Sequence, residues 1–331
     1  MKFLRDERVR GYLKKYRWII AIYVLAMLVF IFGDRSSFEI YKLSQDRSSP
    51  GIVSSSADKT VYPLKITDFK GREITIAKMP QRIISLTPSS TEILFQIGAG
   101  SRVVGVTAYD DYPAEVESLP KVGDFNGPNL EAIVKENPDI IFASDLSGQE
   151  QVEALEKNGF TVAILEANNL NQIMESINKI GQITDTQKQS NEVALTMQNR
   201  LNEITKKVKD LPKVKTFYLV DINGNWTAGK GTFIDELITL GGGENITTDV
   251  QGWVKYSVEK IVEKNPSVII TAPHAGDTLS IAKMPGYKDT TAAKNNLIYV
   301  VSDDNIISRP AYRIILGLEE IAKFLHPEAF R

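Results

Sequence analysis

The sequence predicts two related α/β lobes joined by a long helical connector and preceded by a single N-terminal transmembrane helix. Three observations predict this organisation. Short apolar strands alternate with amphipathic helices, one segment recurs in the second half of the chain, and a proline-free helical stretch separates the two copies. The 331 residues are enough for about two domains.

The N-terminal segment carries the signals of a membrane anchor. Residues 18–33 form an uncharged apolar run, and seven basic residues precede it in residues 1–17. This basic excess predicts that the N-terminus faces the cytoplasm and that the rest of the chain lies outside the membrane. No small-residue cleavage site follows the run, which favours an uncleaved signal anchor over a cleaved signal peptide. Residues 34–60 are serine-rich and are expected to form a flexible tether.

Residues 61–170 are predicted to form the N-terminal lobe. The alternating sequence LKITDFKGREITIA turns at Lys70-Gly71, which indicates a β-hairpin. The strands expected next are RIISL (82–86), VVGVT (103–107), DIIFAS (139–144) and TVAILE (161–166), with helices at 92–97, 130–137 and 150–158. This alternation is typical of a parallel sheet.

Residues 171–210 form the predicted connector. Apolar residues recur three or four positions apart and no proline interrupts them, which predicts one long helix or two in sequence near Thr184-Asp185. The α/β alternation resumes in residues 211–331, the predicted C-terminal lobe. Its expected strands are TFYLVD (216–221), SVIITA (267–272) and LIYVV (297–301), and its helices are 232–240, 257–265 and a last helix ending near Leu325.

An internal repeat relates the two lobes. Residues 129–143 read NLEAIVKENPDIIFA and residues 257–271 read SVEKIVEKNPSVIIT, so that without gaps Glu131 matches Glu259. The other identical pairs are Ile133/Ile261, Val134/Val262, Asn137/Asn265, Pro138/Pro266 and Ile141/Ile269. Two half-domains of similar plan on either side of a connector predict a cleft between two lobes.

Composition excludes several classes of function. The formal net charge of −2 argues against a protein that coats nucleic acid. Cysteine is absent, which removes disulfides, thiol catalysis, cysteine metal sites and the lipid-bearing cysteine of a bacterial lipoprotein. His274 and His326 are the only histidines, so clustered imidazole ligands are excluded. We expect no enzyme activity, metal or cofactor, because no nucleophile, base and orienting group can be assembled.

The adjacent acids Asp110-Asp111 and Asp303-Asp304 are expected in solvated turns.

Four aromatic residues are predicted to lie on loops. Tyr109 follows a strand, Phe125 lies in the GDFNGPN loop, Trp226 follows TFYLVD, and Trp253 lies in the QGWVKYS loop. For each one, a core position is the ordinary alternative. Two in each lobe, beside glycine, asparagine and aspartate, favour an aromatic-lined cleft for a large, flat or apolar ligand.

Several stretches, in order, resemble one protein family. They are PQRIISLTPSSTEILFQIGAGSRVVGVTAYDDYP, LPKVGDFNGPNLEAIVKENPDII, WTAGKGTFIDELITLGGGENI, YSVEKIVEKNPSVII and SRPAYRIILGLEEIAKFLHPE. Over roughly residues 62–328, the chain is similar to the substrate-binding proteins of ABC importers for vitamin B12, iron–siderophores and heme. The resemblance implies a type III periplasmic-binding-protein fold, whose lobes are joined by a long backbone helix, with little hinge motion and no catalysis.

Within that family the chain most resembles the cobalamin-binding branch. The resemblance implies that a corrinoid lies between the aromatic residues at Tyr109, Phe125, Trp226 and Trp253. A further tryptophan of that branch is replaced here by Ser144. We therefore expect an anchored extracytoplasmic receptor that delivers cobalamin, as a transported ligand, to an ABC importer composed of a permease and its ATPase.

The repeated acids Glu131 and Glu259 have two interpretations. An acid in the first turn of a helix offsets the helix dipole, which needs no partner. The resemblance implies instead that the two glutamates, one in each lobe, dock on arginines of the two permease subunits.

Other functions stay open at this level. Siderophore or heme binding is the first alternative, because the proteins that bind these ligands share the fold. Arg309 would suit a siderophore. An anchored hydrolase or a sensor ectodomain is the alternative from a different class.

Overall fold

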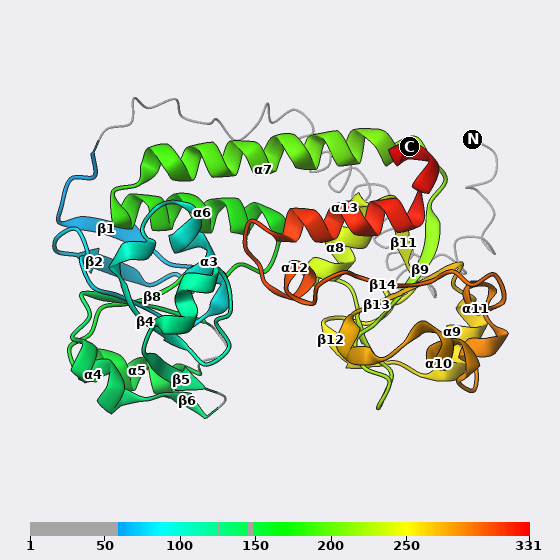
Figure 1. Ribbon diagram of the computed structural model, residues 1–331, viewed down its shortest axis with the longest axis horizontal. Coiled ribbons are helices and arrows are strands. Elements are labelled where there is room, and N and C mark those ends of the chain that lie inside the picture. Colours follow the sequence, from blue (N-terminus) through cyan, green and yellow to red (C-terminus); the bar gives the residue numbers. More distant parts are fainter. Residues whose placement is uncertain (1–58, 125, 145–147) are drawn as a thin grey trace, which may run out of the picture. The chain divides into compact units, whose positions relative to one another are not determined.

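The computed structural model describes residues 59–124, 126–144 and 148–331 (Figure 1). All of them belong to one unit of tertiary structure, Ala57–Arg331. None of the helices within these described ranges has the length and apolar character needed to span a membrane. The predicted cytoplasmic segment 1–17, the anchor 18–33 and the tether up to residue 58 lie outside the described residues.

The described chain begins with the predicted hairpin. Strands β1 (Leu64–Thr67) and β2 (Glu73–Ile76) pair antiparallel, with Leu64 opposite Ile76. Asp68 stabilises the turn, because its carboxylate accepts hydrogen bonds from the backbone amides of Lys70 and Arg72 and from the Arg72 guanidinium. Gly71 has a φ of +76°, a conformation that favours glycine. The hairpin expected at Lys70-Gly71 is confirmed.

A six-stranded sheet forms the N-terminal lobe, in the order β6-β5-β4-β3-β7-β8. Its pairs are parallel except for β5 with β6. The strands are β3 (Ile83–Ser85), β4 (Val103–Thr107), β5 (Lys121–Asp124), β6 (Gly127–Pro128), β7 (Ile140–Ala143) and β8 (Val162–Ile164), and the helices are α3 (Pro88–Gln96), α4 (Leu130–Glu136) and α5 (Gln149–Lys157). The parallel sheet was predicted, but β5 and β6 were not, because KVGD and GP lack an apolar run.

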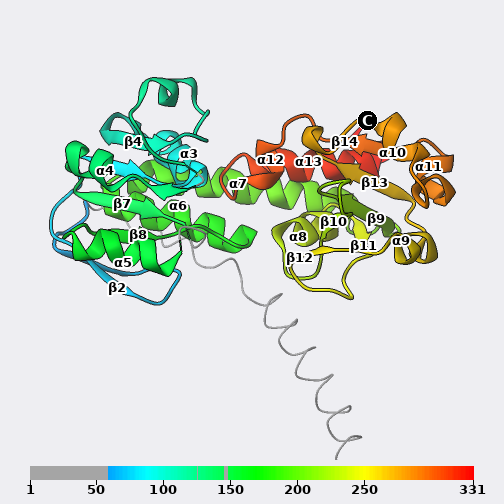
Figure 2. The same ribbon diagram turned by 90° about the horizontal axis from the view of Figure 1, so that it is seen from below.

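The connector consists of two helices, α6 (Leu170–Thr184) and α7 (Gln187–Val208), which pack side by side (Figure 1). The chain reverses at Asp185, whose φ of +55° ends α6. Gly181 permits the close packing, because a Cβ there would lie 2.2 Å from Ser190 Oγ. Of the two predicted possibilities, a break near Thr184-Asp185 is therefore the correct one, and a single helix over 171–210 is wrong. Helix α7 extends from the N-terminal lobe to the C-terminal lobe, where it packs against α8 (Phe233–Leu240) and α13 (Ile314–Leu325) (Figure 2).

The C-terminal lobe contains a four-stranded parallel sheet in the order β11-β9-β13-β14 and a separate two-stranded ribbon of β10 and β12. The strands are β9 (Val214–Leu219), β10 (Trp226–Ala228), β11 (Gly243–Asn245), β12 (Trp253–Lys255), β13 (Val268–Thr271) and β14 (Ile298–Val300). The helices are α8 (Phe233–Leu240), α9 (Val258–Lys264), α10 (Thr278–Lys283), α11 (Thr291–Lys294), α12 (Asn305–Ser308) and α13 (Ile314–Leu325). Short 3₁₀ turns lie at Gly100–Arg102, Ala114–Ser118, Pro273–Ala275, Tyr287–Asp289 and Pro327–Phe330.

The internal repeat is visible in the backbone. Helices α4 and α9 begin at Asn129 and Ser257, whose side chains accept hydrogen bonds from the backbone amides of Ala132 and Lys260. Both helices end at an asparagine in the left-handed region, Asn137 with φ +42° and Asn265 with φ +47°. A proline and the strands β7 and β13 follow. The two copies therefore form the same helix–cap–strand unit, one in each lobe.

The hydrophobic core joins the lobes. One cluster of buried residues includes Ile83 and Ile140 of the first sheet, Ile177 of α6, Met197 of α7 and Leu318 of α13. Two smaller clusters lie on the other faces of the sheets, around Ile84 and Ile141 in one lobe and around Phe217 and Ile269 in the other. Neighbouring strand residues thus point to opposite faces, as the pleat requires. The lobes share one continuous apolar core through α6, α7 and α13.

Candidate functional site

The two predicted ligand tryptophans lie on the same face of the β10–β12 ribbon. Trp226 is opposite Lys255 and Trp253 is opposite Ala228, so the tryptophans occupy diagonal positions two residues apart in register. They are 37% and 46% exposed. Each tryptophan is the first residue of its strand, whereas the sequence predicted loops, because a three-residue strand has no readable alternation.

The surroundings of the tryptophans orient both rings. Trp253 contacts Phe233 edge to face, with ring centroids 5.7 Å apart. The Lys255 ammonium lies 5.7 Å from the centroid of the Trp226 ring. A tight turn positions Trp226, whose backbone amide donates to the Asp221 carbonyl at 3.1 Å. Asn225, just before it, has a φ of +51°. The ribbon therefore presents two half-exposed indole rings with defined supports.

Tyr109 lies in the other lobe, two residues after β4, and is 42% exposed. Its backbone amide donates to Thr107 Oγ1, and its carbonyl accepts a hydrogen bond from Arg309 Nη2 at 3.1 Å. Asp110, the next residue, accepts from the Thr107 amide at 2.9 Å. Asp110 is only 4% exposed, and burial raises the pKa of its carboxyl group. The expectation that Asp110 lies in a solvated turn is wrong, because the loop folds its carboxylate back onto β4.

Two other positions bear on the predicted ligand site, the predicted ligand residue Phe125 and the substituted position Ser144. Phe125 lies outside the described residues. Ser144 is buried immediately after β7, where the resembled branch carries a tryptophan. The structure therefore brings Trp226 and Trp253 together and places Tyr109 in the opposite lobe. That the four aromatic residues bind one ligand stays a prediction.

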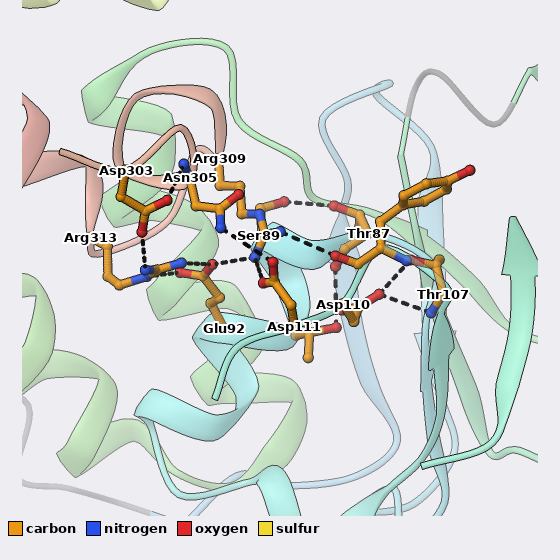
Figure 3. Close-up of polar contacts among 12 residues, drawn as sticks. Thr87, Ser89, Glu92, Thr107, Asp110, Asp111, Asp303, Asn305, Arg309 and Arg313 are labelled. Carbon is orange, nitrogen blue, oxygen red and sulfur yellow. Dashed lines mark hydrogen bonds and ion pairs between the residues drawn. The ribbon is translucent and has the colours of Figure 1, made fainter. Parts of the chain in front are cut away.

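Arg309 is not a free cation. Its guanidinium contacts Asp111 Oδ1 at 2.6 Å and Glu92 Oε1 at 3.1 Å, and both partners belong to the N-terminal lobe (Figure 3). Burial acts to raise the pKa of Asp111, but the hydrogen bond and charge of Arg309 outweigh it and hold that pKa below its usual range. Sequence reasoning missed Glu92, Asp111 and Arg313 at this place. Ion pairs over about 200 residues of sequence leave no local pattern.

The histidines do not form a metal centre. His274 Nδ1 lies 2.8 Å from Asp304 Oδ1 on the surface, and buried His326 contacts the Gly242 carbonyl through Nε2 at 3.2 Å at the end of α13. In the part of the chain that the structure describes, no group of histidine, cysteine, aspartate and glutamate side chains is suited to hold a metal ion.

Glu131 and Glu259 occupy equivalent places in the repeat. Both are exposed and both lie in the first turn of their helix, α4 or α9. One turn further, the matching residues Val134 and Val262 are 54% and 36% exposed. Each lobe therefore presents the same pair of side chains, an acid followed by a valine three positions later, on one helix face.

Comparison with known proteins identifies the family. A family model described as periplasmic binding protein matches residues 83–304. The chain belongs to this family. Among curated relatives, the uncharacterized ABC transporter substrate-binding lipoprotein YvrC of Bacillus subtilis is 32% identical, over 84% of this chain and 90% of the relative. A vitamin B12-binding protein of Salmonella choleraesuis is 30% identical, over 74% of this chain and 90% of the relative.

A solved structure agrees with this assignment. The crystal structure of a possible iron-binding, periplasmic solute-binding protein from Staphylococcus epidermidis matches with a TM-score of 0.67 at 32% identity, and covers 75% of this chain and all of that one. The fold of residues 59–331 is therefore the type III periplasmic-binding-protein fold, as the resemblance implied. This family consists of binding proteins and is not a class of enzymes.

Proposed function

We propose that this chain is the substrate-binding component of an ABC importer and that its ligand is a corrinoid, with cobalamin as the specific candidate. The observation that carries the ligand choice is the pair of half-exposed indole rings on one face of the β10–β12 ribbon. Large aromatic side chains that serve only packing are mostly buried, whereas exposed rings held by neighbours suit a flat, largely apolar ligand. Tyr109 extends the proposed site to the other lobe.

The names of the relatives support the same choice. The Salmonella relative is called a vitamin B12-binding protein and YvrC a substrate-binding lipoprotein of an ABC transporter. A lipoprotein is held at a membrane by its lipid. For this cysteine-free chain we propose that residues 18–33 take that role and place the binding domain outside the cytoplasm.

Iron–siderophore or heme binding is the second candidate, because the Staphylococcus protein is described as possibly iron-binding. An anionic siderophore needs an available cation, but Arg309 is already paired with Glu92 and Asp111. Heme needs an axial ligand for its iron, and Tyr109 is an exposed tyrosine that would suit this role.

Titration of the full chain in detergent with cyanocobalamin, ferric siderophores and heme tests the ligand choice. We expect cobalamin to bind most tightly and to quench the fluorescence of Trp226 and Trp253. Trp226→Ala and Trp253→Ala should each weaken binding about tenfold, or ~1.4 kcal/mol. Phe330→Ala, a change at the C-terminal 3₁₀ turn, should leave the affinity unchanged. Tighter binding of a siderophore or heme than of cobalamin would contradict the ligand choice but not the importer role.

We also propose that Glu131 and Glu259 dock on the permease. The repeat places one exposed acid in each lobe, which suits a partner with two equivalent subunits. Neither glutamate has an ion-pair partner among the described residues, so both carboxylates are available. The exposed Val134 and Val262 beside them add apolar area to each contact.

A further inference from the structure

Five charged side chains join the two lobes, and we call them the inter-lobe ion cluster: Glu92, Asp111, Asp303, Arg309 and Arg313 (Figure 3). Glu92 lies on α3, in the N-terminal lobe. Its Oε1 accepts from Arg313 Nη2 at 2.7 Å, and its Oε2 accepts from Arg313 Nε at 2.9 Å. This pair is bidentate, the geometry in which arginine and carboxylate bind most specifically.

Arg309 makes the second connection between the lobes. Besides Glu92, it contacts Asp111 Oδ1 at 2.6 Å through Nη1 and the Tyr109 carbonyl at 3.1 Å through Nη2. Asp111 also accepts a hydrogen bond from Asn305 of α12 at 3.3 Å. One guanidinium therefore holds the loop that carries Tyr109 at two points, the backbone of Tyr109 and the side chain of Asp111.

The central charges of the cluster are largely withdrawn from water. The side chains of Glu92, Arg309 and Arg313 are only 4%, 12% and 14% exposed. Arg313 is further paired with Asp303 at 3.2 Å and covered by the Tyr112 ring, whose centroid is 4.0 Å from its Cζ. A buried charge without its partner costs several kcal/mol. Separation of the lobes would leave Glu92 without either arginine, so the cluster opposes it.

The residues next to Arg309 restrict the backbone from which both arginines project. Arg309 is in an extended conformation, with φ −104° and ψ 115°, as expected for a residue before proline. Pro310 follows, and Ala311 is fully buried. The short segment between α12 and α13 is thus fixed by Pro310 and by packing of Ala311, and both guanidinium groups reach across to α3.

We propose that the inter-lobe ion cluster fixes the relative orientation of the two lobes and that Arg309 is a positioning residue for the Tyr109 loop, residues 107–113. Arg309 acts through the Tyr109 carbonyl and Asp111 and needs no contact with a ligand. The orientation of the lobes is independent of the ligand. The consequence for binding rests on the proposed function, in which Tyr109 contacts the ligand.

The absence of cysteine permits a direct test of lobe orientation. Cysteines introduced at the exposed positions Ala154 on α5 and Lys283 on α10 of the full chain would carry spin labels for distance measurement. We expect a single narrow distance distribution in this background. Arg309→Ala, Arg313→Lys and Glu92→Gln should broaden it, because each removes part of the cluster. Arg200→Ala is the matched control, since Arg200 pairs with Glu319 outside the cluster.

Hydrogen exchange tests the second part of the proposal. In Arg309→Ala, the backbone amides of residues 107–112 should exchange about tenfold faster than in the parent chain, whereas Arg200→Ala should not change them. Unchanged distance distributions in all three cluster variants would overturn the role in lobe orientation. Unchanged exchange in Arg309→Ala would overturn the positioning role. Both measurements use the ligand-free protein, so failure of cobalamin to bind would contradict the proposed function alone.

Discussion

At the scale of single residues, Asp110 is the most informative carboxylate of the Tyr109 loop. It is buried beside β4, where it accepts hydrogen bonds from Thr107 and lies within the field of Arg309. Burial disfavours its charged form and raises its pKa, and the hydrogen bonds and the arginine only partly offset this effect. The loop thus contains a carboxyl group that is harder to ionise in the folded than in the unfolded state.

We predict that Asp110→Asn changes the pH dependence of stability. Because the folded pKa is raised, the unfolded state releases this proton first, and folding stability from this group falls as pH rises above about 4. Asparagine does not ionise, so the stability of the variant has no such dependence on pH at this position. The difference between the thermal midpoints of the parent chain and of Asp110→Asn, parent minus variant, should therefore decrease between pH 3 and pH 7, as measured by thermal unfolding.

Asp139→Asn is the control, because the pKa of Asp139 is shifted in the opposite direction to that of Asp110. Burial acts to raise the pKa of Asp139, but hydrogen bonds from the backbone amides of Gln81 and Arg82 outweigh it, and the net pKa is lowered. Its contribution to stability is present above the unfolded pKa and is lost as pH falls. The prediction for Asp110 would be contradicted if the parent-minus-variant difference in thermal midpoint stayed constant or increased between pH 3 and pH 7.

At the scale of elements, the repeated helices α4 and α9 both end at an asparagine with positive φ, but the side chains of the two asparagines make different contacts. Asn137 and Asn265 both adopt positive φ angles, which asparagine and glycine tolerate better than other residues. The side chain of Asn265 also accepts a hydrogen bond from the Thr291 amide at 2.7 Å. The second copy thus uses the side chain of its asparagine to attach the start of α11.

This difference predicts the effect of cap substitutions. Asn137→Ala and Asn265→Ala should each destabilise the protein by about 1–2 kcal/mol, because the left-handed backbone conformation is less favourable for alanine than for asparagine. Asn137→Gly should be nearly neutral, whereas Asn265→Gly should still cost about 1 kcal/mol through the lost hydrogen bond to Thr291. Denaturant unfolding measures all four variants. Equal effects of the two glycine substitutions would contradict the assigned role of the Asn265 side chain.

At the scale of the whole molecule, the lobes are held together both by the shared apolar core and by the inter-lobe ion cluster. The core runs from the first sheet through α6 and α7 to α13, and the cluster joins α3 to the segment before α13. Two connections at different places leave little freedom for one lobe to rotate against the other. If both proposals hold, the lobes present α4 and α9 at a fixed separation, which suits a two-point contact with the permease.

The docking proposal predicts a graded loss of transport. Glu131→Ala and Glu259→Ala should each reduce uptake of the ligand by the permease modestly, and the double variant should reduce it more, because rim charges mainly set orientation and association rate. Ligand affinity should not change. Glu203→Ala, an exposed acid on α7, is the control, because α7 lies on the side of the molecule away from α4 and α9 (Figure 1). Unchanged uptake in the double variant would leave only the helix-dipole role.

The anchor prediction concerns the full chain. Protein recovered from membranes should retain residues 1–17, and mass spectrometry of the intact protein would measure this. A soluble species that begins near Ser36 as the main product would contradict the prediction. About 25 flexible tether residues would span roughly 25–30 Å, so an uncleaved anchor would hold the binding domain near a permease in the same membrane.

Sequence alone was sufficient for features that depend on residues close together in the chain. The repeat and the hairpin at Lys70-Gly71 were predicted, and the break near Thr184-Asp185 was one of the two predicted possibilities, because periodicity and turns are decided within a few residues. The family resemblance was also correct, since several such stretches occur in one order.

Only the tertiary structure decided the contacts between distant segments. The pairing of β10 with β12 brings Trp226 and Trp253 onto one face, although 27 positions of sequence separate them. Arg313 meets Glu92 across 221 positions, and Arg309, which sequence suggested as a ligand for a siderophore, is instead paired within the protein. These contacts depend on how the lobes pack around a shared core, and that packing is a property of the whole chain with no signature in any short stretch of it.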